Sequence, residues 1–159
     1  MPAPPPPEAI CRMAPSPARR LFALGTLYAL GVIILWLTFT VAPPLLWQGG
    51  LVVFALAVLW LGEKMRRATR SWLDVTEEEV VDGSGTVLAR IDEIESVERG
   101  LFAFKPANGF VLVLKARRSG HWAPGLWWRS GRRVGGGGVT SRAEAKLMAE
   151  QIAMLADRS

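Results

Sequence analysis

An uninterrupted apolar stretch from Leu21 to Gly62 constrains this chain more than any other feature, because it contains no Lys, Arg, Asp, Glu or His. A helix needs about 20 apolar residues to cross a hydrocarbon core of ~30 Å, so the stretch is long enough for two crossings. Pro43 and Pro44 lie near its middle, where proline is expected at a turn between two helices. The sequence therefore predicts a transmembrane helical hairpin over residues 21–70.

Basic residues flank both ends of the predicted hairpin and indicate its orientation. Residues 1–70 carry seven bases and two acids, and this difference of five equals the net charge of +5 of the whole chain. Because bases in short flanking segments remain on the cytoplasmic side of a membrane, both termini are predicted to be cytoplasmic. A surplus located at the membrane flanks also argues against a nucleic-acid partner. The bases that flank the apolar stretch are Arg19, Arg20, Lys64, Arg66, Arg67 and Arg70.

The first twenty residues are rich in proline and in small side chains. Proline removes backbone donors and favours extended conformations, so we expect a leader over residues 1–20 that is disordered or adopts polyproline II. This leader contains Cys11, the single cysteine of the chain. One cysteine excludes an intramolecular disulfide and a metal site built from clustered thiolates.

Residues 72–159 are predicted to form one α+β domain of short strands followed by a helix. Ser141 and Glu144 have the spacing of a capping box, and apolar residues follow at helical intervals, which predicts a helix from Arg142 to Leu155. Asn108-Gly109 predicts a hairpin turn between strands at 101–105 and 110–116. Further strands are predicted at 72–76, 80–83, 86–91, 126–129 and 132–134, the last two separated by a turn at Ser130-Gly131.

The predicted domain divides into an acidic half and a basic half. Residues 73–98 contain nine acids and one base, whereas residues 99–143 contain nine bases and no acid. Such segregation favours a basic face for phosphates or acidic partners, and tryptophan beside it suits lipid headgroups. In the alternative, the two halves neutralise each other across strands and the tryptophans lie in the core. The candidate residues for contact with a lipid or partner are Arg117, Arg118, Trp127, Trp128, Arg129, Arg132 and Arg133.

A run of four glycines, Gly135 to Gly138, leads into the predicted C-terminal helix. Because glycine-rich loops at helix N-termini can cradle phosphates, a nucleotide- or phosphate-binding regulator is an alternative function. The run lacks the Lys-Ser/Thr pair of a Walker loop, and tight passage of the chain from strand into helix also accounts for it. His121 is the only histidine, and no catalytic motif surrounds it, so we expect no enzyme, no metal site and no cofactor.

Three segments of the chain resemble bacterial PH-like (pleckstrin-homology-like) domains that follow a two-helix membrane anchor. They are LDVTEEEVVDG, IDEIESVERG and SRAEAKLMAEQIAML, and the resemblance covers Trp72 to Ala156. It implies a bent, partly open antiparallel β-barrel that is capped by the C-terminal helix. It also implies a multi-pass protein of the bacterial inner membrane.

These observations together predict a non-enzymatic inner-membrane protein that presents a PH-like module at the cytoplasmic surface. The expected role is that of a scaffold, an assembly factor or an accessory subunit of a larger membrane complex. The expected partners are the membrane itself and either anionic lipid headgroups or an acidic protein.

Overall fold

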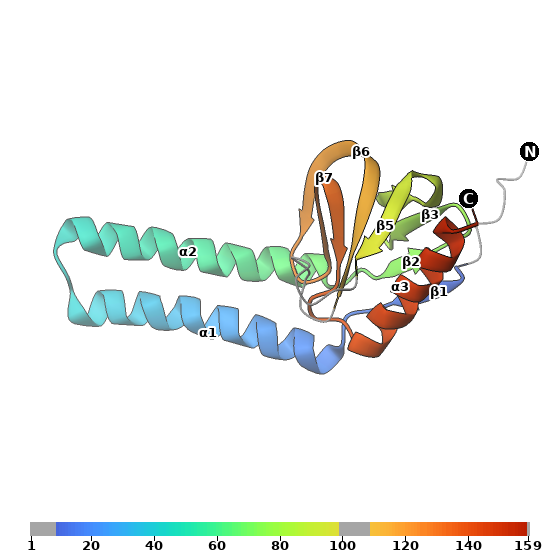
Figure 1. The fold of residues 1–159 in the computed structure, drawn as a ribbon. Coiled ribbons are helices and arrows are strands. Elements are labelled where there is room, and N and C mark those ends of the chain that lie inside the picture. Colours follow the sequence, from blue (N-terminus) through green and yellow to red (C-terminus); the bar gives the residue numbers. More distant parts are fainter. Residues whose placement is uncertain (1–8, 99–108, 159) are drawn as a thin grey trace, which may run out of the picture.

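Two long helices extend side by side from a β-rich domain in the computed structural model of the protein, which describes residues 9–98 and 109–158 (Figure 1). Helix α1 spans Pro17–Val41 and helix α2 spans Leu45–Ala68. Pro43 and Pro44 lie between them, and Ala42 ends α1 in a left-handed conformation with φ 46°. The predicted helical hairpin is therefore confirmed. Helix α1 begins earlier than the apolar stretch because Pro17 occupies its first turn, where the missing N–H is not needed.

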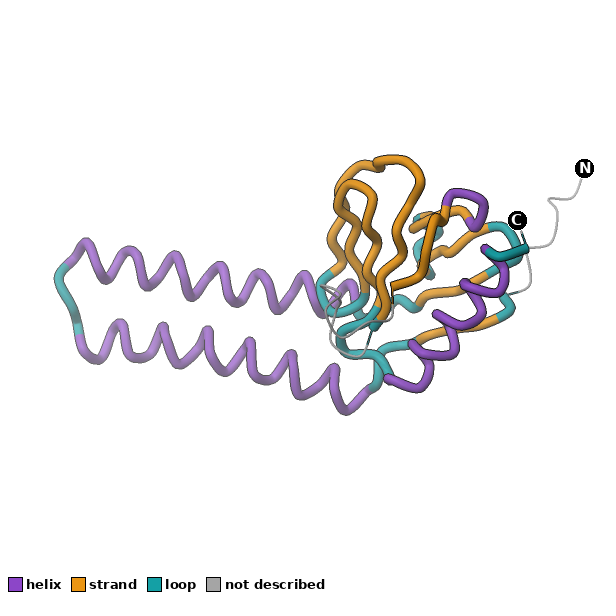
Figure 2. Tube along the Cα trace, viewed as in Figure 1, coloured by secondary structure: helices purple, strands orange, loops and turns teal. Residues whose placement is uncertain are grey.

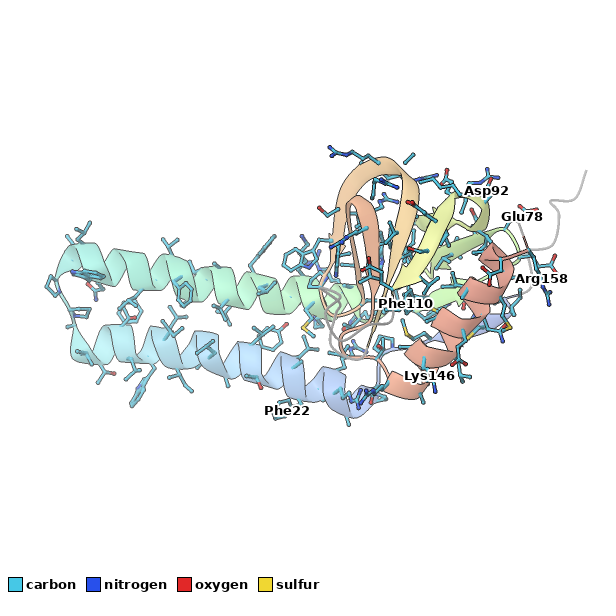
Figure 3. The ribbon with its side chains drawn as sticks, viewed as in Figure 1. Phe22, Glu78, Asp92, Phe110, Lys146 and Arg158 are labelled. Atoms are coloured by element: carbon cyan, nitrogen blue, oxygen red, sulfur yellow. The ribbon has the colours of Figure 1, made fainter. Side chains whose placement is uncertain are left out.

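The surface of the hairpin is apolar and exposed. With a rise of about 1.5 Å per residue, helices of 25 and 24 residues are roughly 36–38 Å long. Only 17% of the most apolar window of α1 and 11% of that of α2 is buried. Figure 3 shows the side chains along the hairpin, among them Phe22, projecting away from the two helices. Both helices are long and apolar enough to span a membrane.

The β-strands form two antiparallel sheets, drawn in orange in Figure 2. The first sheet has the order β1-β2-β3-β4, and the second has the order β5-β6-β7. A 3-10 turn, Ile91–Glu93, joins the two sheets, and helix α3 spans Arg142–Ala156. The strands are β1 Cys11–Met13, β2 Leu73–Val75, β3 Glu79–Asp82, β4 Val87–Arg90, β5 Ile94–Glu98, β6 Phe110–Ala123 and β7 Trp127–Gly136.

Strand β1 lies before the hairpin in the chain and yet belongs to the first sheet. It pairs antiparallel with β2, with Cys11 opposite Val75 and Met13 opposite Leu73. Between these pairs, Arg12 forms a two-pronged ion pair with Asp74, with N–O distances of 2.7 and 2.9 Å. Residues 14–16 lead from β1 into α1, and residues 69–72 lead from α2 into β2. The hairpin is therefore an insertion between two neighbouring strands of one sheet.

The position of β1 corrects the prediction of a disordered leader over residues 1–20. Met13 is 0% exposed and packs in the domain core, while the N–H of Ile10 donates to the carbonyl of Val75 at 2.8 Å. Burial of an apolar side chain and strand pairing together offset the entropy of ordering this segment. Burial also raises the pKa of the Cys11 thiol, and the carboxylates of Glu144 and Asp74 add to the shift. Residues 1–8 lie outside the described part of the chain.

Helix α3 covers the core and confirms the predicted C-terminal helix, which ends at Ala156 instead of Leu155. Its buried side chains are Ala145, Met148, Ala149 and Ile152. The predicted capping box is wrong, because the Ser141 side chain makes no capping hydrogen bond. Glu144 instead accepts a hydrogen bond from the N–H of Ala14 at 3.2 Å and so ties α3 to the segment after β1.

The second sheet differs from the prediction at two places. Residues 127–136 form one continuous strand, β7, so the predicted turn at Ser130-Gly131 is wrong. Gly131 has φ 59° and lies where the register with β6 shifts, so the dipeptide forms an irregularity within a paired strand. The apolar strand predicted at 110–116 is confirmed as the start of β6, the central strand of its sheet. The strand predicted at 101–105 and Asn108 of its turn lie outside the described residues.

The two sheets and α3 give the α+β layout that the sequence predicts, but the barrel is not closed. Strands β4 and β7 are the neighbouring edges, and among the described residues no strand pairing joins them. The side chain of Arg129 on β7 crosses this gap, as described below. The core between the sheets contains Leu73, Leu88, Phe110, Leu112 and Trp127, all 1% exposed or less.

Candidate functional site at the base of the hairpin

Three of the arginines predicted to form a basic contact face are paired with acids of the same domain. Arg118 contacts Glu93 at 2.6 Å, and Arg133 lies 3.8 Å from Glu98. Arg132 pairs with Glu95 across the intervening strand and also donates to the carbonyl of Leu114 at 2.7 Å. The acidic and basic halves of the sequence therefore neutralise each other across β5, β6 and β7 at these positions. Arg117 is exposed.

Arg129 connects the open edges of the two sheets. Its guanidinium donates to the carbonyls of Val87 and Leu88 on β4 at 2.9 and 3.2 Å, and to the carbonyl of Ser119 on β6 at 2.8 Å. Burial lowers the pKa of the Arg129 side chain, and the nearby charge of Arg118 adds to this effect. A guanidinium that donates to three carbonyls links the two sheets, and contact of Arg129 with a lipid or partner stays a prediction.

The predicted role of Trp127 in partner or lipid contact is wrong, because this side chain is 1% exposed. Its indole N–H donates to Asp82 at 3.2 Å, and its ring stacks on His121 with centroids 4.7 Å apart. Trp128 is half-buried and packs on Gly135. Trp122 was not among the predicted contact residues, yet it is 48% exposed. Sequence alone does not say which of three nearby tryptophans faces inward.

The four glycines are used for close packing of the chain. Gly135 and Gly136 belong to β7, where a side chain would collide with the rings of Trp128 and Phe110. Gly137 and Gly138 have φ 137° and 122°, a conformation that favours glycine. The N–H of Gly137 donates to the carbonyl of Leu126 at 2.8 Å. This arrangement favours tight passage of the chain over a loop that cradles a phosphate.

The bases predicted to flank the membrane gather where the hairpin meets the domain, an end that we call the hairpin base (residues 17–28 and 60–70). Glu63 accepts hydrogen bonds from Arg66 at 2.6 Å and from Arg67 at 2.8 Å. Tyr28 of α1 donates to the same carboxylate at 3.3 Å and so links the two helices. Arg19 donates to the carbonyl of Thr140 at 2.6 Å. Arg20 is half-buried and Arg70 is exposed.

Lys64 lies between two aromatic rings at this base. Its ammonium is 5.2 Å from the ring centroid of Trp60 and 4.7 Å from that of Trp122. Cation–π contact holds the lysine without neutralising it. Trp60 and Trp122 are both exposed, so the hairpin base combines positive charge with indole rings, the composition that a headgroup region favours.

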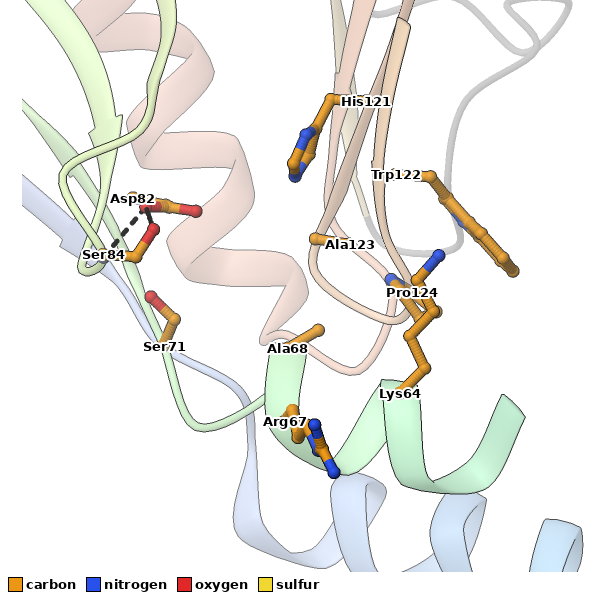
Figure 4. A pocket seen from close by; sticks show the side chains of 10 residues that line it. All are labelled: Lys64, Arg67, Ala68, Ser71, Asp82, Ser84, His121, Trp122, Ala123 and Pro124. Carbon is orange, nitrogen blue, oxygen red and sulfur yellow. Dashed lines mark hydrogen bonds between the residues drawn. The ribbon is translucent and has the colours of Figure 1, made fainter. Parts of the chain in front are cut away.

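A cavity of about 260 Å³ lies beside Lys64, where α2 meets the turn after β3 and the turn between β6 and β7 (Figure 4). Figure 4 shows Lys64 and Arg67 on the helix, Ser71, Asp82 and Ser84 on the opposite side, and His121 and Trp122 on β6. The hydroxyl of Ser71 is buried and has no hydrogen-bond partner among the described residues. We regard this cavity as the candidate site.

Asp82 forms the wall of the cavity and is fully hydrogen-bonded. One carboxylate oxygen accepts from the N–H groups of Ser84 and Thr86, at 2.9 and 3.0 Å, and from the Ser84 hydroxyl. The other accepts from the indole N–H of Trp127. These donors offset the charge of Asp82 and fix the turn after β3.

The ionisable side chains that line the cavity are two bases, one carboxylate and one histidine. In residues 9–98 and 109–158, no group of three or more His, Cys, Asp or Glu side chains could hold a metal ion. The residues that line the cavity come from three separate segments of the chain, 64–71, 82–84 and 121–124, so no local sequence motif predicts the site. The only sequence signals were the flanking bases Lys64 and Arg67 and the single histidine, His121.

Comparison of the chain with models of protein families, with curated proteins and with solved structures found no match.

The bridge between the two sheets gives a test of the role of Arg129. Replacement of Arg129 by Ala removes a donor to three carbonyls, and we expect the free energy of unfolding to fall by on the order of 1–2 kcal/mol. Arg117→Ala is the matched control, because this arginine is exposed, and should change stability by less than about 0.5 kcal/mol. Denaturant unfolding of the full chain in detergent measures the free energy of unfolding of both variants. Equal stability of the two variants would contradict a structural role for Arg129.

Proposed function

We propose that the protein is a non-enzymatic integral membrane protein that presents a PH-like module at the cytoplasmic surface. In this role it acts as a scaffold, assembly factor or accessory subunit of a membrane complex. The observation that carries the proposal is the insertion of the hairpin between β1 and β2. Both ends of the apolar hairpin are built into one sheet through segments 14–16 and 69–72, so the domain is fixed beside the hairpin base and has no long tether.

The PH-like assignment is supported by the order of elements. A four-stranded antiparallel sheet, a three-stranded antiparallel sheet and a C-terminal helix follow one another, with the helix packed over the core. The open edge between β4 and β7 is compatible with the partly open barrel that the sequence resemblance implies. The location in a bacterial inner membrane rests on the same resemblance.

Contact with anionic lipid is proposed for the hairpin base. Arg118, Arg129 and Arg132 are committed to contacts within the domain. Lys64 and Arg70 make no ion pair among the described residues, and bases near an anionic surface each gain about 1 kcal/mol. We therefore place the membrane-facing surface on Lys64, Arg70, Trp60 and Trp122.

The proposed orientation follows from the positive residues at the hairpin base, which keep this end on the cytoplasmic side. In a Cys11→Ser background, a cysteine at Gly49 near the turn should react with an impermeant thiol reagent added outside intact cells. A cysteine at the exposed Ser119 should react only after the membrane is permeabilised. The opposite pattern would contradict the proposed orientation.

The scaffold role is tested by purification of the full chain from its own membrane in mild detergent, followed by native mass spectrometry. We expect a stoichiometric protein partner in addition to the 17.4 kDa protomer. A matched variant carries a flexible Gly-Ser insertion of about ten residues after Arg70, which leaves the membrane helices intact but frees one attachment of the domain. The partner should be lost from this variant. A wild-type chain that carries only lipid would contradict the scaffold role.

A further inference from the structure

The cavity at the hairpin base has an excess of positive charge. Lys64 and Arg67 line it from α2, and Asp82 is the only carboxylate among the residues that line it. Both oxygens of Asp82 are already occupied by hydrogen-bond donors from its own turn and from Trp127. Lys64 has no carboxylate partner among the described residues, and its ammonium touches only ring faces. Arg67 is already paired with Glu63 at 2.8 Å, so Lys64 supplies the positive charge that remains for a ligand.

A buried hydroxyl in the cavity wall lacks a partner. The Ser71 oxygen is shielded from solvent and makes no hydrogen bond within residues 9–98 and 109–158. Buried polar groups in folded proteins are nearly always paired, so such a hydroxyl is an unused donor. His121, held against Trp127 by ring stacking, brings a second polar group to the same cavity. A ligand with several acceptor oxygens would satisfy this set of donors.

Size and position narrow the class of ligand. A cavity of about 260 Å³ is smaller than most pockets for drug-sized molecules, but it is large enough for one phosphate group and a few neighbouring atoms. It lies in the last turns of α2, beside the exposed rings of Trp60 and Trp122. The partial negative charge of a helix C-terminus is offset there by the bases Lys64, Arg66 and Arg67.

We propose that this cavity binds a phosphate group, and that the phosphate belongs to a phospholipid headgroup. Lys64 supplies the positive charge, Arg67 lies beside it in its ion pair with Glu63, and rotation of the Ser71 side chain presents its hydroxyl to one of the phosphate oxygens. The proposal rests on the placement of the domain at the membrane surface under the proposed function, and it assigns a ligand to the hairpin base. Occupancy by a headgroup would join α2 to the turns after β3 and after β6.

Native mass spectrometry of the full chain in detergent tests the proposal, with phosphatidylglycerol added at increasing concentration. We expect saturable binding of one lipid, and no binding of diacylglycerol with the same acyl chains. Lys64→Ala should weaken binding about tenfold, the equivalent of losing one charged contact. Ser71→Ala should weaken it about threefold while the melting temperature stays equal or rises, because an unpaired hydroxyl has been removed.

The matched control is Lys146→Ala, which removes a lysine of the same charge from α3, where Lys146 lies 3.9 Å from Glu150. Equal binding by the Lys64, Ser71 and Lys146 variants would overturn the assignment, as would equal binding of diacylglycerol. Binding of inorganic phosphate without binding of phosphatidylglycerol would retain the phosphate site but overturn the lipid as its source. Because this assay needs no partner protein, loss of the scaffold role would leave its outcome unaffected.

Discussion

The pairing of β1 with β2 is the interaction on which the rest of the structure depends. These strands are separated in the chain by the whole hairpin, and they are joined by the ion pair of Arg12 with Asp74 and by the buried side chain of Met13. Strand β1 leads into α1, and α2 leads into β2. The pairing of β1 with β2 therefore joins both ends of the hairpin to the folded domain. The position of the domain relative to the helices is therefore a property of the sheet and not of a linker.

The fold also determines which charged side chains are paired within the domain and which remain available for external contact. Within the domain, Glu93, Glu95 and Glu98 neutralise Arg118, Arg132 and Arg133, and Arg129 connects the edges of the two sheets. Bases without a carboxylate partner remain at the hairpin base, beside exposed tryptophans and a cavity with a buried hydroxyl that is unpaired among the described residues, and Arg117 is exposed on β6. Acids and bases that are segregated along the sequence thus pair across the strands of the domain, and a smaller group of bases at the hairpin base is the surface that we propose to face the membrane.

Local patterns in the sequence predicted the elements that are formed by residues close together in the chain. The apolar run between the bases predicted the hairpin, and the spacing of Met148 and Ile152 predicted α3. Features that depend on distant pairing were missed. A proline-rich segment with one buried methionine carries no signal for a strand whose partner lies about sixty residues away, and a Ser-Gly dipeptide is compatible with either a turn or an irregular strand. The cavity depends on the same long-range topology.

Hydrogen exchange of the full chain in lipid nanodiscs tests the insertion of the hairpin into the sheet most directly. The amides of Ile10 and Ser16 donate to the carbonyls of Val75 and Val139 at 2.8 and 2.9 Å. Peptides that cover residues 10–16 should therefore exchange as slowly as those that cover β2. Rapid exchange of residues 10–16 beside a protected β2 would show that the segment before α1 is not part of the sheet, and would contradict the account.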